Sequence, residues 1–159
     1  KDRQQYLKWR DYIYAHLDTL YELLGTEYCL FGEWLWCQHA VLYNELPDFL
    51  IAFDVLHKQT GAFMSTPKVK AFLPDDVHHV PSVKVWDTSS MNVKKFMDEL
   101  NAILERKSAF GSENQEGLYI RFESEDIVEF RTKFRRKTFV CGRDDFDKGV
   151  KNNKLASQK

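Results

Sequence analysis

The chain has 159 residues, of which 43% are apolar and 14% aromatic, which suits one folded domain with a hydrophobic core. Its 23 Lys and Arg residues nearly balance 24 Asp and Glu residues, so the formal charge of −1 gives no general attraction to nucleic acid. No apolar run is long enough to span a bilayer, and the polar start KDRQQ is unlike a secretory signal. Cys29, Cys37 and Cys141 lack paired spacing and read as free thiols, so we expect an intracellular protein, cytoplasmic or nuclear.

The first half of the chain predicts helices inserted between strands. Apolar residues at helical spacing over residues 6–24 predict an amphipathic helix whose apolar side faces the core. Aromatic and aliphatic runs at 28–37 and 48–56 predict buried strands, and 62–65 can pair back as a hairpin. A Thr-Pro pair then predicts the start of a short helix over 66–72.

The second half predicts a short strand at 83–86 and a helix from about residue 92 to 106, which Ser90 or Asn92 could cap. Two further strands are expected at 117–123 and 127–134, joined by an acidic turn. Strands that follow one another through turns favour an α+β class with largely antiparallel sheets and inserted helices.

Two acidic positions stand out in these strands. Glu33 lies in the apolar run FGEWLW, where an ionised carboxylate is costly unless it is paired or faces a cleft. It could equally lie on the exposed face of an edge strand. Glu116 opens the segment EGLYIR, in which Gly117 would let a ligand approach the backbone.

A basic segment follows, with six Lys or Arg residues and no acidic residue from 130 to 143. Alternate side chains of a strand share a face, so Arg131, Lys133 and Arg135 should point one way and Arg136 the other. These charges repel one another unless a polyanion or a carboxylate is near. A phosphate-binding strand fits this pattern, but so does a solvated edge strand whose basic side chains block aggregation.

The order of these segments resembles the motif series of covalent nucleotidyltransferases. The residues within each segment resemble the motifs of the ATP-dependent RNA ligase branch. FGEWLW looks like that branch's third motif, EGLYIR like the fourth and RTKFRR like the fifth. The resemblance runs from about residue 3 to about residue 140. It implies a nucleotidyltransferase fold, the ATP-grasp-like ligase core, over 1–143, followed by a polar tail or linker at 144–159.

The resemblance also implies roles for individual residues. Glu33 would bind the ribose hydroxyls of ATP, and Phe53 would stack on the adenine, although Phe53 could instead be an ordinary core residue. Glu116 would act at a metal ion or at the lysine nucleophile. Lys133, helped by Arg131, would hold the α-phosphate and stabilise the charge that develops on it.

Family members form lysyl-AMP from ATP, pass the AMP to an RNA 5′-phosphate and join that end to a 3′-hydroxyl, with Mg²⁺ neutralising phosphate charge. The cofactors implied are therefore ATP and Mg²⁺, and the partner is RNA with such ends. Arg135, Arg136 and Lys137 would contact the RNA.

The family's first motif, KxxG, does not precede FGEWLW. The single KxxG, from Lys58 to Gly61, comes after Glu33 in an expected hairpin turn. We therefore expect a fragment that lacks its nucleophilic lysine and is inactive alone, with the missing N-terminal segment as a partner. The alternatives are a non-catalytic RNA-binding module, or a nucleotidyltransferase of the DNA ligase or capping-enzyme type.

Overall fold

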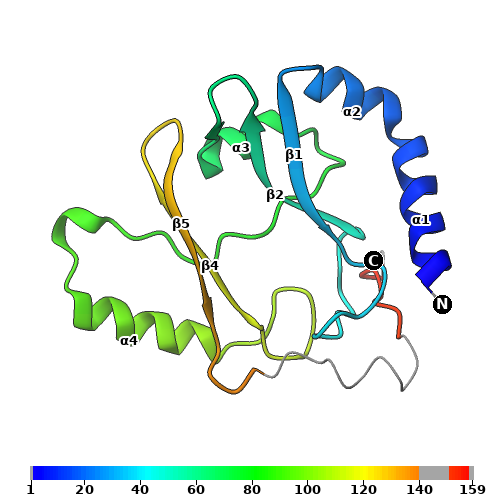
Figure 1. The fold of residues 1–159 in the computed structure, drawn as a ribbon. Helices are drawn as coiled ribbons and strands as arrows, with labels where there is room; N and C mark the ends of the chain where they lie inside the picture. The colour runs from blue at the N-terminus through cyan, green and yellow to red at the C-terminus, as the bar shows by residue number, and fades with distance from the viewer. Residues whose placement is uncertain (1, 140–150, 158–159) are drawn as a thin grey trace.

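The computed structural model describes residues 2–139 and 151–157, which form two small antiparallel sheets flanked by helices (Figure 1). The strands are β1 (Tyr28–Trp34), β2 (Leu50–His57), β3 (Ala62–Phe63), β4 (Gly117–Glu123) and β5 (Val128–Arg135). The helices are α1 (Asp2–Ala15), α2 (Leu17–Leu24), α3 (Thr66–Phe72) and α4 (Val93–Leu104), with a 3₁₀ turn, η1 (Thr88–Ser90). The expected α+β class is confirmed, and no helix in the described ranges is long and apolar enough to cross a bilayer.

The first sheet has the order β1-β2-β3, so β1 and β3 are its edges. β2 is the most buried of the three, because it lies in the middle and its apolar residues pack on both faces. Ala52 and Val55 form one core cluster with Val69 of α3, while Ile51 joins Leu35 and Leu46 in another. The predicted hairpin after β2 and the helix α3 are both present.

The second sheet is the β4–β5 hairpin, and α4 packs on one of its faces. Asn92 caps α4 by accepting a hydrogen bond from the backbone of Lys95, as the sequence predicts. Leu100, Ile103 and Leu104 of α4 pack against Leu118 of β4. Because side chains alternate along a strand, the odd-numbered residues of β4 are left for the face turned toward the first sheet.

Four local predictions were wrong. Residues 83–86 form no strand: Val83 and Val85 are 49% and 83% exposed, and without a partner strand an extended segment gains no ladder hydrogen bonds. The N-terminal helix is two helices, because the helix α1 ends at Ala15 and α2 begins at Leu17. Their predicted apolar side is not core, because Tyr6 and Leu17 are exposed and the rest of it is only partly buried. The strand β1 likewise contains no fully buried residue.

Part of the expected polar tail packs against the loop that follows β1 (Figure 1). Asn153 is buried, and its amide donates to the carbonyls of Leu35 and Cys37 while its oxygen accepts from the backbone N–H of Tyr43. One side chain thus satisfies three backbone groups of that loop, which would otherwise need other partners. The remainder of the tail lies outside the described residues, as does Cys141.

Asn153→Ala should lower the free energy of unfolding by about 1–3 kcal/mol, because it leaves buried backbone groups without partners. Asn152→Ala is the matched control, since the side chain of Asn152 is exposed, and it should change stability by less than about 0.5 kcal/mol. Urea unfolding of both variants measures the difference. Equal effects would show that the contacts of Asn153 do not stabilise the fold.

Candidate functional site

The two sheets meet through Asp54 of β2, a carboxylate that is 0% exposed. Nη1 of Arg131 on β5 donates to Oδ2 at 2.7 Å, and the hydroxyl of Tyr119 on β4 donates to the same oxygen at 3.1 Å. Nη1 of Arg121, also on β4, lies 2.7 Å from Oδ1. Two cations and a phenol from the hairpin therefore compensate one buried charge of the first sheet.

Arg121 also holds the backbone around Asp54. Its Nη1 and Nη2 donate to the carbonyls of Phe53 and Met64 at 2.7 and 2.6 Å. Its contacts with Asp54 Oδ1, through Nη1, and with Glu123 Oε1, through Nε, are charge attractions rather than aligned hydrogen bonds. The side chain is only 9% exposed, so the guanidinium depends on these acceptors.

Tyr119 remains a hydrogen-bond donor in this arrangement. Burial, and then the negative charge of Asp54, raise the pKa of Tyr119, so the phenol stays protonated at neutral pH. Its ring lies edge-on to that of Phe53, with centroids 6.3 Å apart. Phe53 is half-buried, so part of the ring expected to stack on adenine is accessible.

Arg131 is engaged on two sides. Besides Asp54, its guanidinium carbon lies 3.7 Å from the centroid of the Phe63 ring, a cation–π contact with β3. The expected role of Arg131 toward a phosphate stays a prediction, and in this arrangement the residue first serves to join the sheets.

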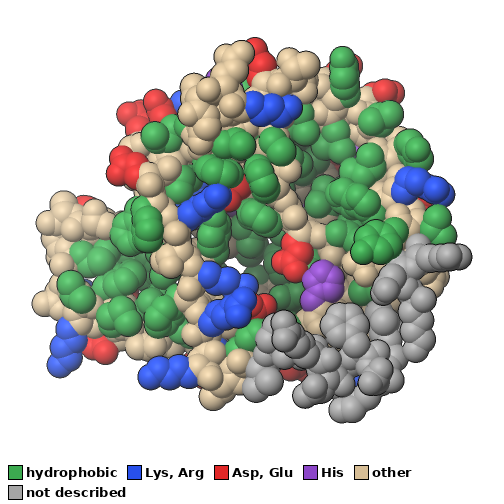
Figure 2. Space-filling view, viewed as in Figure 1, with side chains coloured by type: hydrophobic (Ala, Val, Ile, Leu, Met, Phe, Trp, Pro, Cys, Tyr) green, Lys and Arg blue, Asp and Glu red, His purple; other side chains and the backbone are tan. Residues whose placement is uncertain are grey.

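Lys133 lies two residues further along the same face of β5. Its Nζ is 2.6 Å from Oε1 of Glu116, and Nε of Arg135 is 3.4 Å from the same oxygen. The predicted common face of Arg131, Lys133 and Arg135 is therefore confirmed, because all three reach carboxylates on one side of the hairpin. Figure 2 shows Lys and Arg side chains gathered over β5, beside a hollow in this face.

Glu33 lies on the edge strand β1, and its side chain is exposed. This is the alternative in which Glu33 occupies the exposed face of an edge strand. Its Oε1 is 3.2 Å from Nδ1 of His39, in the loop after β1. The hydrogen bond to Glu33 favours the imidazolium and raises the pKa of His39. Glu33 is thus paired with a histidine that the sequence analysis did not single out.

Tyr43 lies within the electric field of two carboxylates, Glu33 on β1 and Glu116 just before β4. Burial raises the pKa of Tyr43 to about 12, and the negative charges of Glu33 and of Glu116 add to the effect. Both carboxylates therefore lie close enough to one phenol for their fields to act on it. Two acidic residues that are more than eighty positions apart in the sequence thus both lie in the neighbourhood of Tyr43.

Glycines allow close strand contacts in two of the motifs. A Cβ at Gly32 would lie 2.9 Å from the carbonyl oxygen of Ile51, and one at Gly117 would lie 2.5 Å from that of Phe134. Any other residue would push the paired strands apart. The expectation that Gly117 gives a ligand access to the backbone was therefore wrong: the backbone of β5 occupies that space.

The remaining sequence candidates lie elsewhere. Arg136 follows β5 and lines a pocket, and Lys137 is exposed. Lys58 is in the turn beyond β2, where His57 pairs with Tyr28 at the far end of β1 from Glu33. Five residues of strand put it roughly 17 Å away from Glu33.

Sequence reasoning missed Asp54, Arg121 and Tyr119. The available signal was a lone Asp inside the apolar run FLIAFDVL, since a buried carboxylate requires a cation. No group of three or more potential metal ligands is present in the described residues. Glu116 alone could supply a carboxylate to Mg²⁺, which commonly takes one or two carboxylates besides phosphate oxygens and water.

A family model for RNA ligases matches residues 1–138, and this range contains every predicted site residue. The chain belongs to the RNA ligase family. No curated protein and no solved structure matches this RNA ligase family member. Membership indicates an RNA ligase-type function with RNA as the substrate, and it favours RNA ligases over the DNA ligase and capping-enzyme alternatives.

Asp54→Ala should lower the free energy of unfolding of this RNA ligase family chain by about 3–5 kcal/mol, because it removes the buried carboxylate that Arg121 and Arg131 share. Asp126→Ala is the control: Asp126 pairs with Lys68 at 2.7 Å, but both side chains are more than half exposed. Such a surface pair contributes about 0–1 kcal/mol. Chemical denaturation compares the two, and a loss for Asp54→Ala no larger than the control's would contradict the central role of this carboxylate.

Proposed function

We propose that the face of the β4–β5 hairpin turned toward the first sheet binds ATP, and that the chain serves an RNA ligase reaction in which a lysine other than Lys58 and Lys133 attacks the α-phosphate, pyrophosphate leaves and lysyl-AMP forms. The observation that carries the proposal is the row Arg131, Lys133 and Arg135, which lies on one face and ends beside Glu116. Three cations held at fixed spacing suit a polyphosphate better than a solvated edge strand, because each is oriented by a carboxylate.

Lys133 would contact the α-phosphate. Its ammonium is half-exposed and 2.6 Å from Glu116, so it can exchange this contact for a phosphate oxygen. In that position it stabilises the negative charge that develops as the phosphate is transferred. Mg²⁺ would be held by Glu116 together with phosphate oxygens, and would supply charge neutralisation.

Glu33 and Phe53 would bind the nucleoside. Their strands pair directly, with Glu33 opposite Ile51, two residues from Phe53. A carboxylate can accept hydrogen bonds from both ribose hydroxyls, and an accessible ring can stack on the base. His39 would leave Glu33 or share it with the ribose.

RNA would lie against the end of β5, where Arg135, Arg136 and Lys137 follow one another. Arg135 is only 3.4 Å from Glu116, so it would stand between the nucleotide and the RNA. Transfer of AMP to a 5′-phosphate and sealing to a 3′-hydroxyl would then take place beside Lys133.

ATP with Mg²⁺ should bind the chain, and Phe53→Ala should weaken binding by about 1–3 kcal/mol through the lost stacking. Lys133→Ala should weaken it by about 1.5–3 kcal/mol, since it removes a charged donor. Isothermal titration calorimetry measures both. The matched controls are Phe130→Ala, on the opposite face of β5, and Lys94→Ala, exposed on α4.

These outcomes also discriminate between the two classes of function. A non-catalytic RNA-binding module should bind RNA but not ATP. Calorimetry would then detect no ATP binding for the unmodified chain, for Phe53→Ala or for Lys133→Ala. ATP binding that Phe53→Ala leaves intact would remove Phe53 from the site, and the same holds for Lys133.

Lys58 should not become covalently labelled with AMP, because the turn after β2 lies at the opposite end of β1 from Glu33. Incubation with ATP labelled at the α-phosphate, followed by peptide mass spectrometry, tests this. AMP attached to Lys58 would overturn the proposed placement of the nucleotide.

A further inference from the structure

Glu33 is held by His39, which lies in the loop after β1. Nδ1 of His39 is 3.2 Å from Oε1 of Glu33, and no other hydrogen bond to this carboxylate is present among the residues that the structure describes. Because an ionised carboxylate can only accept hydrogen bonds, Nδ1 carries the hydrogen and donates it. One carboxylate oxygen therefore has a partner, while Oε2 and the remaining lone pairs stay available to a ligand.

The C-terminal segment fixes the loop that carries His39. Before His39, the side-chain amide of Asn153 donates to the carbonyl of Cys37 at 3.0 Å. After it, the backbone N–H of Tyr43 donates to the side chain of Asn153 at 2.9 Å, and the carbonyl of Tyr43 accepts from the backbone N–H of Lys154 at 2.9 Å. His39 is thus presented by a short stretch of backbone that is hydrogen-bonded on both sides.

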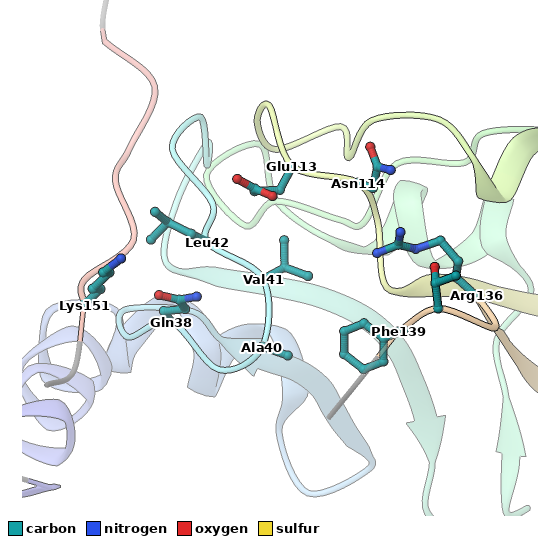
Figure 3. Close-up of a pocket in the computed structure, with 10 residues that line it drawn as sticks. Gln38, Ala40, Val41, Leu42, Glu113, Asn114, Arg136, Phe139 and Lys151 are labelled. Carbon is teal, nitrogen blue, oxygen red and sulfur yellow. The ribbon is translucent and has the colours of Figure 1, made fainter. Parts of the chain in front are cut away.

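The same stretch of backbone turns His39 away from the pocket beside the end of β5 (Figure 3). Gln38 and Ala40 line this pocket, which has a volume of about 340 Å³. His39, although it lies between them in the chain, is not part of the pocket wall and reaches β1 instead. The direction of the imidazole is therefore set by the backbone of the loop.

The pair formed by His39 and Glu33 affects orientation more than stability. Their side chains are 47% and 55% exposed, and an ion pair with that exposure is screened by water and salt, so it contributes little to the free energy of unfolding. A free glutamate side chain on an edge strand samples several rotamers, and ordering it when a ligand binds has an entropic cost. The contact with His39 restricts Glu33 before a ligand arrives, and such preorganisation favours binding.

We propose that His39 is a positioning residue, which holds the carboxylate of Glu33 in the orientation that accepts hydrogen bonds from the ribose hydroxyls of ATP. This inference rests on the proposed function, because it takes Glu33 as the acceptor for the ribose. His39 stays in contact with Oε1 when the nucleotide binds, since a carboxylate offers about four lone-pair sites and can accept from the imidazole and from both hydroxyls. Selection of ribose over 2′-deoxyribose then depends on a residue that need not touch the nucleotide.

The test compares the Kd of ATP with that of 2′-deoxy-ATP, each with Mg²⁺, on the full chain by isothermal titration calorimetry. The wild-type chain should bind ATP about tenfold more tightly, the effect of one hydrogen bond to a charged group. His39→Ala should weaken ATP binding and reduce this ratio to about threefold or less, because Glu33 is no longer oriented. A partly unfolded variant would lose affinity for both nucleotides by the same factor, so the ratio does not report on folding.

Asparagine at position 39 separates the donor from the charge. In His39→Asn the amide nitrogen takes the place of Nδ1 and can donate to Glu33 without a positive charge, so the ratio should return to about tenfold. His57→Ala is the control, because His57 pairs with Tyr28 at the other end of β1 from Glu33. That substitution should leave the ratio unchanged.

Three outcomes overturn the proposal. An unchanged ratio in His39→Ala would make the pair an incidental surface contact. Tighter ATP binding in His39→Ala would show that the imidazole competes with the ribose for Glu33. A ratio that is lost equally in His39→Ala and His39→Asn would show that a donor to Glu33 is not what orients it.

Glu33→Gln separates this inference from the proposed function. The ratio should fall in this variant as well, since an amide accepts through one oxygen only. A ratio that Glu33→Gln lowers and His39→Ala does not lower rejects the role of His39 alone. ATP binding without any preference over 2′-deoxy-ATP removes both residues from ribose recognition but leaves the nucleotide site. A chain that binds neither nucleotide rejects the proposed function, and the role of His39 with it.

Discussion

The arrangement of the two sheets depends on one buried carboxylate. Asp54 is inaccessible to solvent, and a lone ionised carboxylate in such a place is unstable by several kcal/mol. The β4–β5 hairpin offsets that cost with Arg121, Arg131 and Tyr119, all of which contact Asp54. Nonspecific apolar contact would allow the hairpin to slide along β2, whereas these directed contacts fix its position relative to that strand.

This constraint also orients the side chains of the candidate site. Once Arg131 is tied to Asp54, alternation along β5 puts Lys133 and Arg135 on the same face, at successive steps of about 7 Å. Glu116, just before β4, then lies across from them because Tyr119 and Lys133 are paired in the hairpin. The residue that joins the sheets thereby sets the spacing of the cations proposed to bind phosphate.

Local patterns in the sequence predicted the parts of this structure that depend on neighbouring residues. Hairpin alternation placed Arg131, Lys133 and Arg135 correctly, and the Asn92 cap located the start of α4. The failures have a common physical cause. Residues 83–86 have strand-like composition but find no partner strand, and the burial of β1 depends on what covers it, which no local pattern encodes.

The candidate site was only partly predictable for the same reason. Glu33, Glu116 and Lys133 were identified from motifs, but His39 and Asp54 act through pairs that only the folded chain forms. Asp54 and Arg131 are separated by 77 positions, and their contact follows from the packing of two sheets. The lone Asp in an apolar strand was an available signal that a cation is needed, but the sequence does not say which one.

Most charged groups of the proposed nucleotide site already have partners within the chain. Glu33 has His39, Glu116 has Lys133 and Arg135, and Arg131 has Asp54. The half-exposed pairs can be exchanged at little cost, because solvent screens them, whereas the pair at Asp54 cannot. Ligand binding at this face would therefore rearrange Glu116 and Lys133 while the contacts of Asp54 remain. Arg136 differs from all of these, because its buried Nε has no hydrogen-bond partner among the residues that the structure describes.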